Sequence, residues 1–300
     1  MKQLLYKLIY SDSLNPILRN LNRFFKLLLP EATKLPPAGQ IKLKNEVGKA
    51  LIIKTNQTSY LTQLLYWNGY RNFEYTNLFL KLIKKADVFY DIGANIGYYS
   101  LLAVMENETI EVVGFEPASG PLHYFNANVL VNNYTNIQVE SLALSHQEGE
   151  ITFYEVKNKK YSYLEHNLAG ESNAGSKTEG RNFVPNIVKT TTLDTYVKKN
   201  QQKPIDLIKM DTEGTEHFIL QHANTVLTEM KPIIICETLF DTIEGELEKI
   251  MLQYGYEFYN HTKNGLEKVT TIIREKDNGV SNCFFVHPSK KHLITEFVYK

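Results

Sequence analysis

The sequence predicts a doubly wound α/β domain with a mostly parallel sheet, preceded by a helical appendage and followed by a C-terminal antiparallel hairpin. Three observations lead to this fold class. Short apolar runs alternate with helical stretches from residue 88 to residue 254, which is the pattern of βαβ units with helices on both faces of a sheet. Acidic residues directly follow two of these runs, at Glu116 and Asp211. An Asn264-Gly265 pair in the tail is typical of a hairpin turn.

The predicted elements follow from hydrophobic periodicity along the chain. Residues 41–54 alternate loosely and fit a short hairpin, and helical spacing follows in residues 59–67 and 75–84. The predicted strands of the main sheet are residues 88–90, 110–115, 137–139, 207–210 and 233–236. The predicted helices among them are residues 97–105, 119–131, 214–228 and 243–254. Residues 151–156 and 188–193 predict two strands around a polar loop, 157–181, and residues 256–261 and 282–286 predict an antiparallel edge.

Length and composition limit the class of protein. The chain has 300 residues, of which 43% are apolar, so we expect one large domain, residues 45–300, and an appendage, residues 1–44. Lys and Arg balance Asp and Glu at 33 each, which lacks the basic surplus of a nucleic-acid-binding protein. The two cysteines, Cys236 and Cys283, exclude a disulfide scaffold and a cysteine-based metal cluster. Without a signal peptide or an apolar run of membrane-spanning length, the expected location is the cytoplasm.

The N-terminal appendage contains eight basic and two acidic residues, a net charge of +6. Residues 14–29 are apolar at three- and four-residue steps and predict an amphipathic helix, with Pro16 in its first turn and Pro30 at its end. Two interpretations stay open. The helix packs on the main domain or on a partner subunit, as in a homo-oligomer, or it contacts a membrane surface.

A glycine turn follows the first main strand, in Asp91-Ile92-Gly93-Ala94-Asn95-Ile96-Gly97. Glycines are needed where the chain turns sharply and where backbone approaches a ligand. The Gly-x-x-x-Gly spacing differs from the dinucleotide fingerprint, and no Lys follows to make a phosphate loop. The carboxylate of Asp91 suits a cationic amino-acid ligand better than a pyrophosphate.

The next strand ends in Glu116-Pro117, 23 residues after Gly93. An acid at about this distance takes the ribose hydroxyls in nucleoside-binding α/β folds. The third strand leads into Ser141, Leu142 and Ala143, which could flank an adenine ring at the switch point of the sheet. Together these features predict a nucleoside site.

The fourth strand leads into a cluster of acids and one histidine, Asp211, Glu213, Glu216 and His217. Carboxylates also stabilise a helix N-terminus without any catalytic role, so a structural explanation competes with a functional one. We expect Asp211 or Glu213 to orient an acceptor and take its proton, with His217 as an alternative base.

These motifs as an ordered set resemble the FkbM-type methyltransferase family. The set comprises Asp91–Gly97, Phe115-Glu116-Pro117, Thr191–Asp194, Lys209–Gly214 and the strand ending in Glu237. The resemblance implies a class I methyltransferase fold with a seven-stranded sheet, S-adenosylmethionine as methyl donor, and O-methylation of a sugar, glycan or natural-product hydroxyl. It also implies that Asp91, Gly93, Asn95 and Gly97 line the methionine end of the donor and Glu116 its ribose. The full set of donor-binding candidates is Asp91, Gly93, Ala94, Asn95, Gly97, Glu116, Pro117, Ser141, Leu142 and Ala143.

Several alternatives stay open at this point. Asp211, Glu213 and Glu237 could hold a divalent ion that clamps a diol, although no metal is expected. The long loop 157–181 could be a lid, with Ser172 and Asn173 as candidates for acceptor contact. A nicotinamide-dependent sugar reductase or epimerase, and a non-catalytic S-adenosylmethionine-binding module, are the rival functions.

Overall fold

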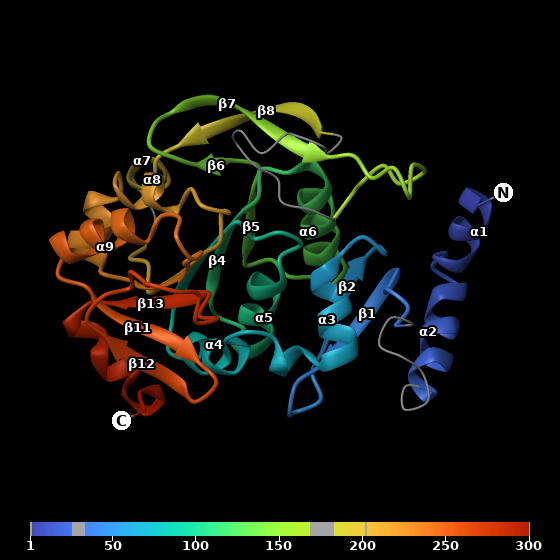
Figure 1. The fold of residues 1–300 in the computed structure, drawn as a ribbon, viewed down its shortest axis with the longest axis horizontal. Coiled ribbons are helices and arrows are strands. Elements are labelled where there is room, and N and C mark those ends of the chain that lie inside the picture. The colour runs from blue at the N-terminus through green and yellow to red at the C-terminus, as the bar shows by residue number, and fades with distance from the viewer. Residues whose placement is uncertain (1, 26–33, 169–182, 202, 300) are drawn as a thin grey trace.

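The computed structural model describes residues 2–25, 34–168, 183–201 and 203–299. Its main element is an eight-stranded sheet (Figure 1). In spatial order the strands are β12 (Gly265–Val269), β11 (Glu257–Thr262), β13 (Asn282–Val286), β10 (Ile233–Glu237), β9 (Leu207–Met210), β3 (Val88–Ile92), β4 (Glu111–Phe115) and β5 (Ile137–Glu140). The predicted seven strands are therefore present, and β12 adds an eighth at the edge, because the hairpin turn at Gly265 returns the chain along β11.

The order of the strands creates a switch point beside β3. The chain moves outward from β3 through β4 to β5, and then returns to the other side of β3 as β9 and β10, with all five strands parallel. Strand β13 runs antiparallel between β10 and β11. The loops after β3 and β9 diverge at this point, so a crevice opens at the carboxyl ends of these strands. The predicted doubly wound fold is thus confirmed.

Two apolar cores cover the two faces of the sheet. Side chains alternate across a strand, so Phe89 faces one core while Val88 and Tyr90 face the other. The first core takes α3 (Tyr60–Asn68), α4 (Thr76–Ile83), α5 (Tyr98–Glu106) and α6 (Ser119–Val131). The second takes α7 (Leu193–Lys199), α8 (Glu216–Leu220) and α9 (Glu244–Gln253). The helix predicted at residues 214–228 is interrupted, with α8 followed by a separate π-helical turn at Val226–Met230.

A smaller three-stranded sheet lies across the top of the molecule in Figure 1. It contains β6 (Ala143–Leu144), β8 (Phe183–Thr191) and β7 (Gly149–Val156) in that order. The two strands predicted around the polar loop are β7 and β8, which pair antiparallel. Of the loop itself, the structure describes residues 157–168. Ser172 and Asn173 lie outside the described residues.

The N-terminal residues form α1 (Lys2–Ile9), α2 (Leu14–Phe24) and the predicted hairpin, β1 (Gly39–Lys44) with β2 (Ala50–Thr55). The hairpin joins residues on both sides of the boundary expected at residue 44. Strand β2 packs on α5 and α6, while α1 and α2 follow one another along the outer flank of the molecule (Figure 1). Short 3-10 helices lie at Tyr70–Asn72, Pro288–Leu293 and Thr295–Phe297. In the part of the chain that the structure describes, each helix is too short or too polar to cross a bilayer.

Candidate active site

The glycine turn after β3 fits against the end of β9. Gly93 has a left-handed φ of +71°, and a Cβ at this position would lie 1.9 Å from the carbonyl oxygen of Asp211. The amides of Gly93 and Ala94 both donate to the Phe115 carbonyl, at 3.0 and 2.9 Å. Gly97, at the start of α5, is left-handed as well and packs directly on Phe125. Only glycine allows the turn to approach the end of β9 at Gly93 and α6 at Gly97 this closely.

Glu116 is held rigidly where β4 ends. Its Oε2 accepts a hydrogen bond of 2.7 Å from the Asn95 amide, and its Oε1 accepts one of 2.8 Å from the Ala118 amide. Each carboxylate oxygen has a second lone pair, so the side chain can still accept hydroxyl donors. Burial raises the pKa of Glu116 to about 7, although both amide hydrogen bonds oppose that rise. The group therefore titrates in the physiological range.

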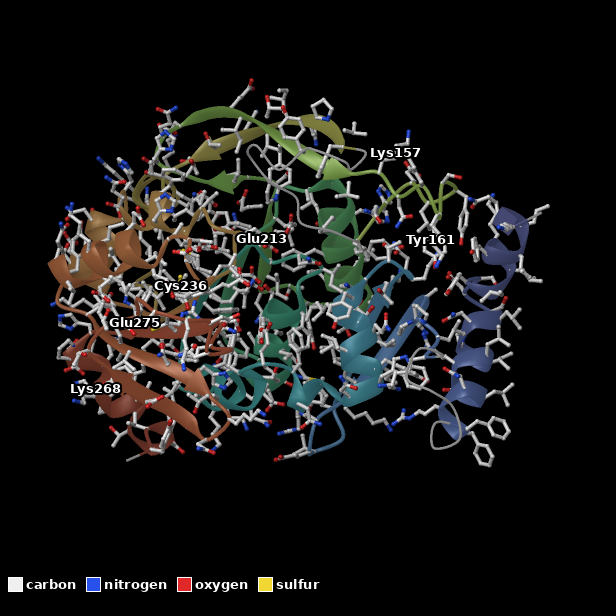
Figure 2. All side chains as sticks on the ribbon, viewed as in Figure 1. Lys157, Tyr161, Glu213, Cys236, Lys268 and Glu275 are labelled. Carbon is white, nitrogen blue, oxygen red and sulfur yellow. The ribbon has the colours of Figure 1, made fainter. Side chains whose placement is uncertain are left out.

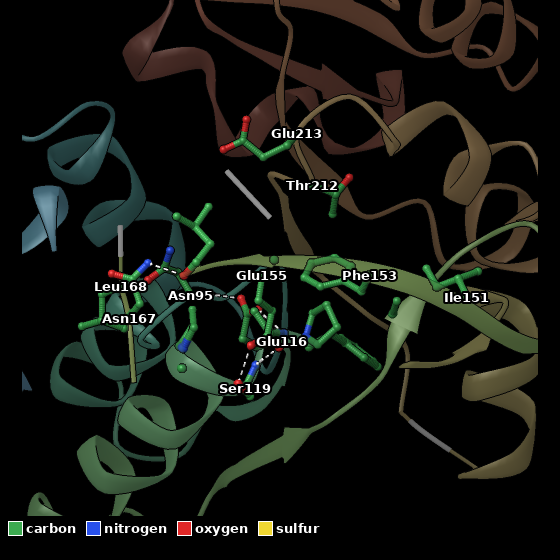
Figure 3. Close-up of a pocket in the computed structure, with 18 of the residues that line it drawn as sticks. Asn95, Glu116, Ser119, Ile151, Phe153, Glu155, Asn167, Leu168, Thr212 and Glu213 are labelled. Atoms are coloured by element: carbon green, nitrogen blue, oxygen red, sulfur yellow. Dashed lines mark hydrogen bonds between the residues drawn. The ribbon is translucent and has the colours of Figure 1, made fainter. Parts of the chain in front are cut away.

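The turn and Glu116 form one side of a cavity of about 560 Å³, within the range of small-molecule sites. Figure 3 shows Asn95 and Glu116 on one side of this pocket, with Thr212 and Glu213 on another. Phe153 and Ile151 of β7 line it from the smaller sheet. The pocket thus lies at the switch point and is covered by β7.

The structure brings most, but not all, of the predicted site residues together at this pocket. Those that line it are Gly93, Asn95, Glu116, Pro117, Leu142, Ala143, Asp211 and Glu213. Asp91, Ala94 and Gly97 instead form the interior of the turn, Ser141 is exposed outside the lining, and His217 lies outside it too. Roles in donor binding or catalysis for all of these residues stay predictions.

Asp91 is part of a buried ion pair instead of a pocket wall. Its Oδ2 accepts hydrogen bonds from the amide and hydroxyl of Ser100, at 3.0 and 2.6 Å. Lys209 of β9 lies 3.6 Å from Oδ1 of Asp91 and 3.6 Å from Oδ2 of Asp211, and it donates to the Gly93 carbonyl at 2.6 Å. Lys209 therefore ties the turn after β3 to the end of β9.

The charge on Lys209 is stabilised by this environment. Burial alone would lower its pKa, but the carboxylates of Asp211, Asp91 and Glu74 outweigh burial and raise it. A lysine that stays protonated is a poor proton acceptor. Lys209 is thus a structural cation and not a candidate base.

Glu237 is a feature of the site that the sequence suggested only as a metal ligand. It lies at the end of β10, and burial, followed by the negative charges of Asp211, Glu213 and Glu216, raises its pKa to about 9. Glu237 therefore carries a proton at neutral pH. A protonated carboxyl group beside Asp211 can donate a hydrogen bond to it and fix its orientation.

Glu213 and His217 differ in their access to the pocket. Glu213 has a left-handed φ of +58° and lines the cavity. His217 packs its ring on Phe218 at a centroid distance of 3.9 Å, and burial lowers its pKa. The described residues contain no group of three His, Cys, Asp or Glu side chains arranged to hold a metal ion.

Residues 157–168 of the loop expected as a lid contribute to the pocket lining, whereas the part of the cover that β7 supplies was not predicted from the sequence. Glu155 of β7 accepts from the amide and the hydroxyl of Ser119 at the start of α6, at 2.8 and 2.5 Å (Figure 3). A Cβ on Gly120 would lie 2.3 Å from the Asn167 carbonyl. These contacts fix the smaller sheet and residues 157–168 to the α6 end of the pocket. Alternation in residues 151–156 predicted a strand. It could not predict that the strand would contact Ser119 at the start of α6, because these residues are far apart in the sequence.

Comparison with known proteins gives matches of two kinds. The family model of the methyltransferase FkbM domain matches residues 91–258 of the chain. Over 74 residues the chain is 35% identical to the 31-O-demethyl-FK506 methyltransferase FkbM of Streptomyces tacrolimicus, a match that spans 24% of this chain and 28% of that protein. The chain thus spans less than a third of the length of this curated relative.

Solved structures of similar fold include two methyltransferases. Methyltransferase FkbM from Methylobacillus flagellatus is 15% identical, with a TM-score of 0.43, over 67% of this chain and 44% of that one. A SAM-dependent methyltransferase from Agrobacterium tumefaciens is 9% identical, with a TM-score of 0.42, over 84% of this chain and 71% of that one.

Proposed function

Because the chain belongs to the FkbM methyltransferase family, we propose that it transfers a methyl group from S-adenosylmethionine to a hydroxyl oxygen on a sugar, glycan or natural product. One observation carries the proposal. The carboxylate of Glu116 and the acids Asp211 and Glu213 line the same pocket from opposite sides of the switch point. A candidate nucleoside-binding acid and a candidate base therefore share one cavity.

The chemistry of the pocket residues fits the proposed donor. Glu116 offers rigid acceptors for a ribose diol, and Phe115 and Leu142 offer apolar surface for a purine. The acids at the end of β9 favour a positively charged methionine end over a pyrophosphate. When bound, S-adenosylmethionine would supply an electrophilic methyl group on a cationic sulfur.

The residues of the chain would then position the acceptor and take its proton. Asp211 lines the pocket, with Lys209 3.6 Å from its Oδ2 and the protonated Glu237 nearby. These neighbours would orient its carboxylate, which in the proposed reaction accepts the hydroxyl proton as the new bond forms. General base catalysis of this kind contributes about 10²–10⁴-fold, and alignment of the reacting atoms contributes about 7–11 kcal/mol.

Two measurements test the proposal. Calorimetry should show heat with S-adenosylhomocysteine and none with NAD, whereas the opposite result would favour a nicotinamide-dependent enzyme. Labelled S-adenosylmethionine should transfer its methyl group to hydroxyl acceptors as an alkali-stable ether. A label released by mild alkali would indicate a carboxyl ester and contradict O-methylation of a hydroxyl.

The variant Asp211→Asn separates catalysis from donor binding. We expect turnover to fall about 10²–10⁴-fold while S-adenosylhomocysteine still binds. Asp241→Asn is the matched control, since Asp241 is exposed and lies outside the pocket lining. Full activity of Asp211→Asn would transfer the role of base to Glu213. Donor binding with no methyl transfer to any acceptor in the wild-type chain would favour the non-catalytic module.

A further inference from the structure

The two N-terminal helices present their apolar side chains to solvent. Seven large apolar residues on or directly after α1 and α2 are between 45% and 82% exposed, namely Leu4, Leu5, Leu8, Ile17, Leu21, Phe24 and Phe25. Figure 1 shows both helices on the flank of the molecule, outside β1. Single exposed apolar residues are normal, but a continuous set on one edge marks an interaction surface. We call these seven residues the flank surface.

Buried polar residues fix the rotation of α2 and keep Ile17, Leu21 and Phe24 outward. Asn15 and Arg19 are the buried residues of this helix. The Oδ1 of Asn15 accepts from the Ala38 amide at 2.8 Å, and its Nδ2 donates to the Pro36 carbonyl at 3.2 Å. Arg19 donates to the carbonyls of Ala38 and Gln40. Because these bonds would be lost if α2 turned around, the amphipathic helix is built with its polar side toward the protein.

Charge is distributed unevenly between this region and the rest of the chain. Residues 1–44 carry a net charge of +6 and residues 45–300 a net charge of −6, for a total of zero. Lys2, Lys7 and Arg23 lie on the same two helices as the flank surface and are exposed. An apolar surface with a basic rim is complementary to anionic lipid headgroups over an acyl layer.

We propose that α1 and α2 bind an anionic membrane surface through the flank surface, lying in the plane of the interface. Their lengths of 8 and 11 residues are well below the roughly 20 needed to span a bilayer. A second copy of the chain is a poorer occupant, because self-association through this surface would bring two appendages of charge +6 together.

Helix α1 and Tyr10, which follows it, contact the segment 157–168. The Gln3 side chain donates to the Lys160 carbonyl at 3.0 Å, and Tyr6 and Tyr10 pack edge-on against Tyr161 at 5.2 and 5.5 Å. Figure 2 shows Tyr161 beside α1. Since Tyr161 lies within residues 157–168, which contribute to the pocket lining, membrane docking would place one wall of the pocket close to the lipid surface.

Co-sedimentation of the full chain with vesicles tests the proposal. We expect binding to phosphatidylcholine vesicles that contain phosphatidylglycerol to exceed binding to pure phosphatidylcholine vesicles by about tenfold or more, and to fall as salt is raised. The double variant Ile17→Glu/Leu21→Glu should reduce the partition coefficient by about tenfold or more. Leu4→Glu/Leu8→Glu on α1 is an independent second variant, in case the first fails to fold.

The matched control is Leu130→Glu/Leu252→Glu, which places the same two charges at exposed leucines, 75% and 55% exposed, on α6 and α9. It should bind anionic vesicles as the wild type does, and all variants should bind S-adenosylhomocysteine equally. Equal binding to both kinds of vesicle, or equal loss in the control, would overturn the proposal. A wild-type dimer that Ile17→Glu/Leu21→Glu converts to a monomer would overturn it as well, in favour of a second copy.

Discussion

Donor affinity should depend on pH through Glu116. This side chain is 6% exposed, and burial raises its pKa to about 7. In the proposed donor complex a ribose hydroxyl donates to the ionised carboxylate, so the protonated form of Glu116 would be the weaker acceptor. With a pKa of about 7, the group is roughly 90% ionised at pH 8 and roughly 10% ionised at pH 6. Lowering the pH from 8 to 6 should therefore weaken binding about tenfold.

The variant Glu116→Gln assigns the effect to this residue. It keeps the size of the side chain but removes the charge-assisted bond, which is worth about 1.5–3 kcal/mol, so affinity at pH 8 should fall by about tenfold or more. The variant should also lose the pH dependence between pH 6 and 8. Calorimetric titration with S-adenosylhomocysteine across this range measures both quantities.

A control with the same substitution lies on the neighbouring strand. Glu140 ends β5, accepts a hydrogen bond from the Tyr196 hydroxyl at 2.9 Å, and lies outside the pocket lining. Glu140→Gln should leave the affinity and its pH dependence unchanged. The reasoning is refuted if the wild-type affinity is constant from pH 6 to 8, or if Glu116→Gln keeps the wild-type slope.

Three further outcomes follow from the packing around the pocket. Gly93→Ala forces a methyl group against the Asp211 carbonyl and should lower the free energy of unfolding, measured with urea, by about 3 kcal/mol or more. The control Gly245→Ala has open space around the added methyl group and should not lower it. Lys209→Met leaves buried carboxylates uncompensated and should lower the free energy of unfolding by about 3–5 kcal/mol. The control is Lys199→Met, which removes an exposed lysine paired with Glu148 and should lower the free energy of unfolding by only about 0–1 kcal/mol. Methyl transfer should survive a chelator, and inhibition that Mg²⁺ reverses would show instead that the reaction depends on a divalent ion.

The strands and the turn of the proposed donor site could be predicted because their signals are local. Gly93 lies between an apolar strand and a helix in sequence, and its left-handed φ is required by the turn that these neighbours define. Glu116 follows its strand directly, so its place at the edge of the sheet follows from the parallel order. The turn at Asn264-Gly265 was predicted, but its returning strand was expected at residues 282–286, whereas residues 265–269, which alternate only weakly, pair directly after the turn as the eighth strand.

The ionisation of the site could not be predicted in the same way. The pKa of Glu237 depends on Asp211, Glu213 and Glu216, which a different strand and loop bring close to it. Asp91 was expected to face a ligand, yet Ser100 and Lys209 hold it in the interior. Likewise, periodicity identified an amphipathic helix in residues 14–29, but only the contacts of Arg19 with Ala38 and Gln40 determine which side faces the protein.

The three-stranded sheet is inserted between β5 and α7, and its strands pair with one another and not with the main sheet. Changes in length or sequence within it would leave the register of the parallel strands intact. The part of the pocket that Ile151 and Phe153 line can thus change while Gly93 and Glu116 keep their places after β3 and β4. Under the proposed function, exchanging this insertion between relatives would alter the wall that β7 supplies and leave the proposed donor side of the pocket intact.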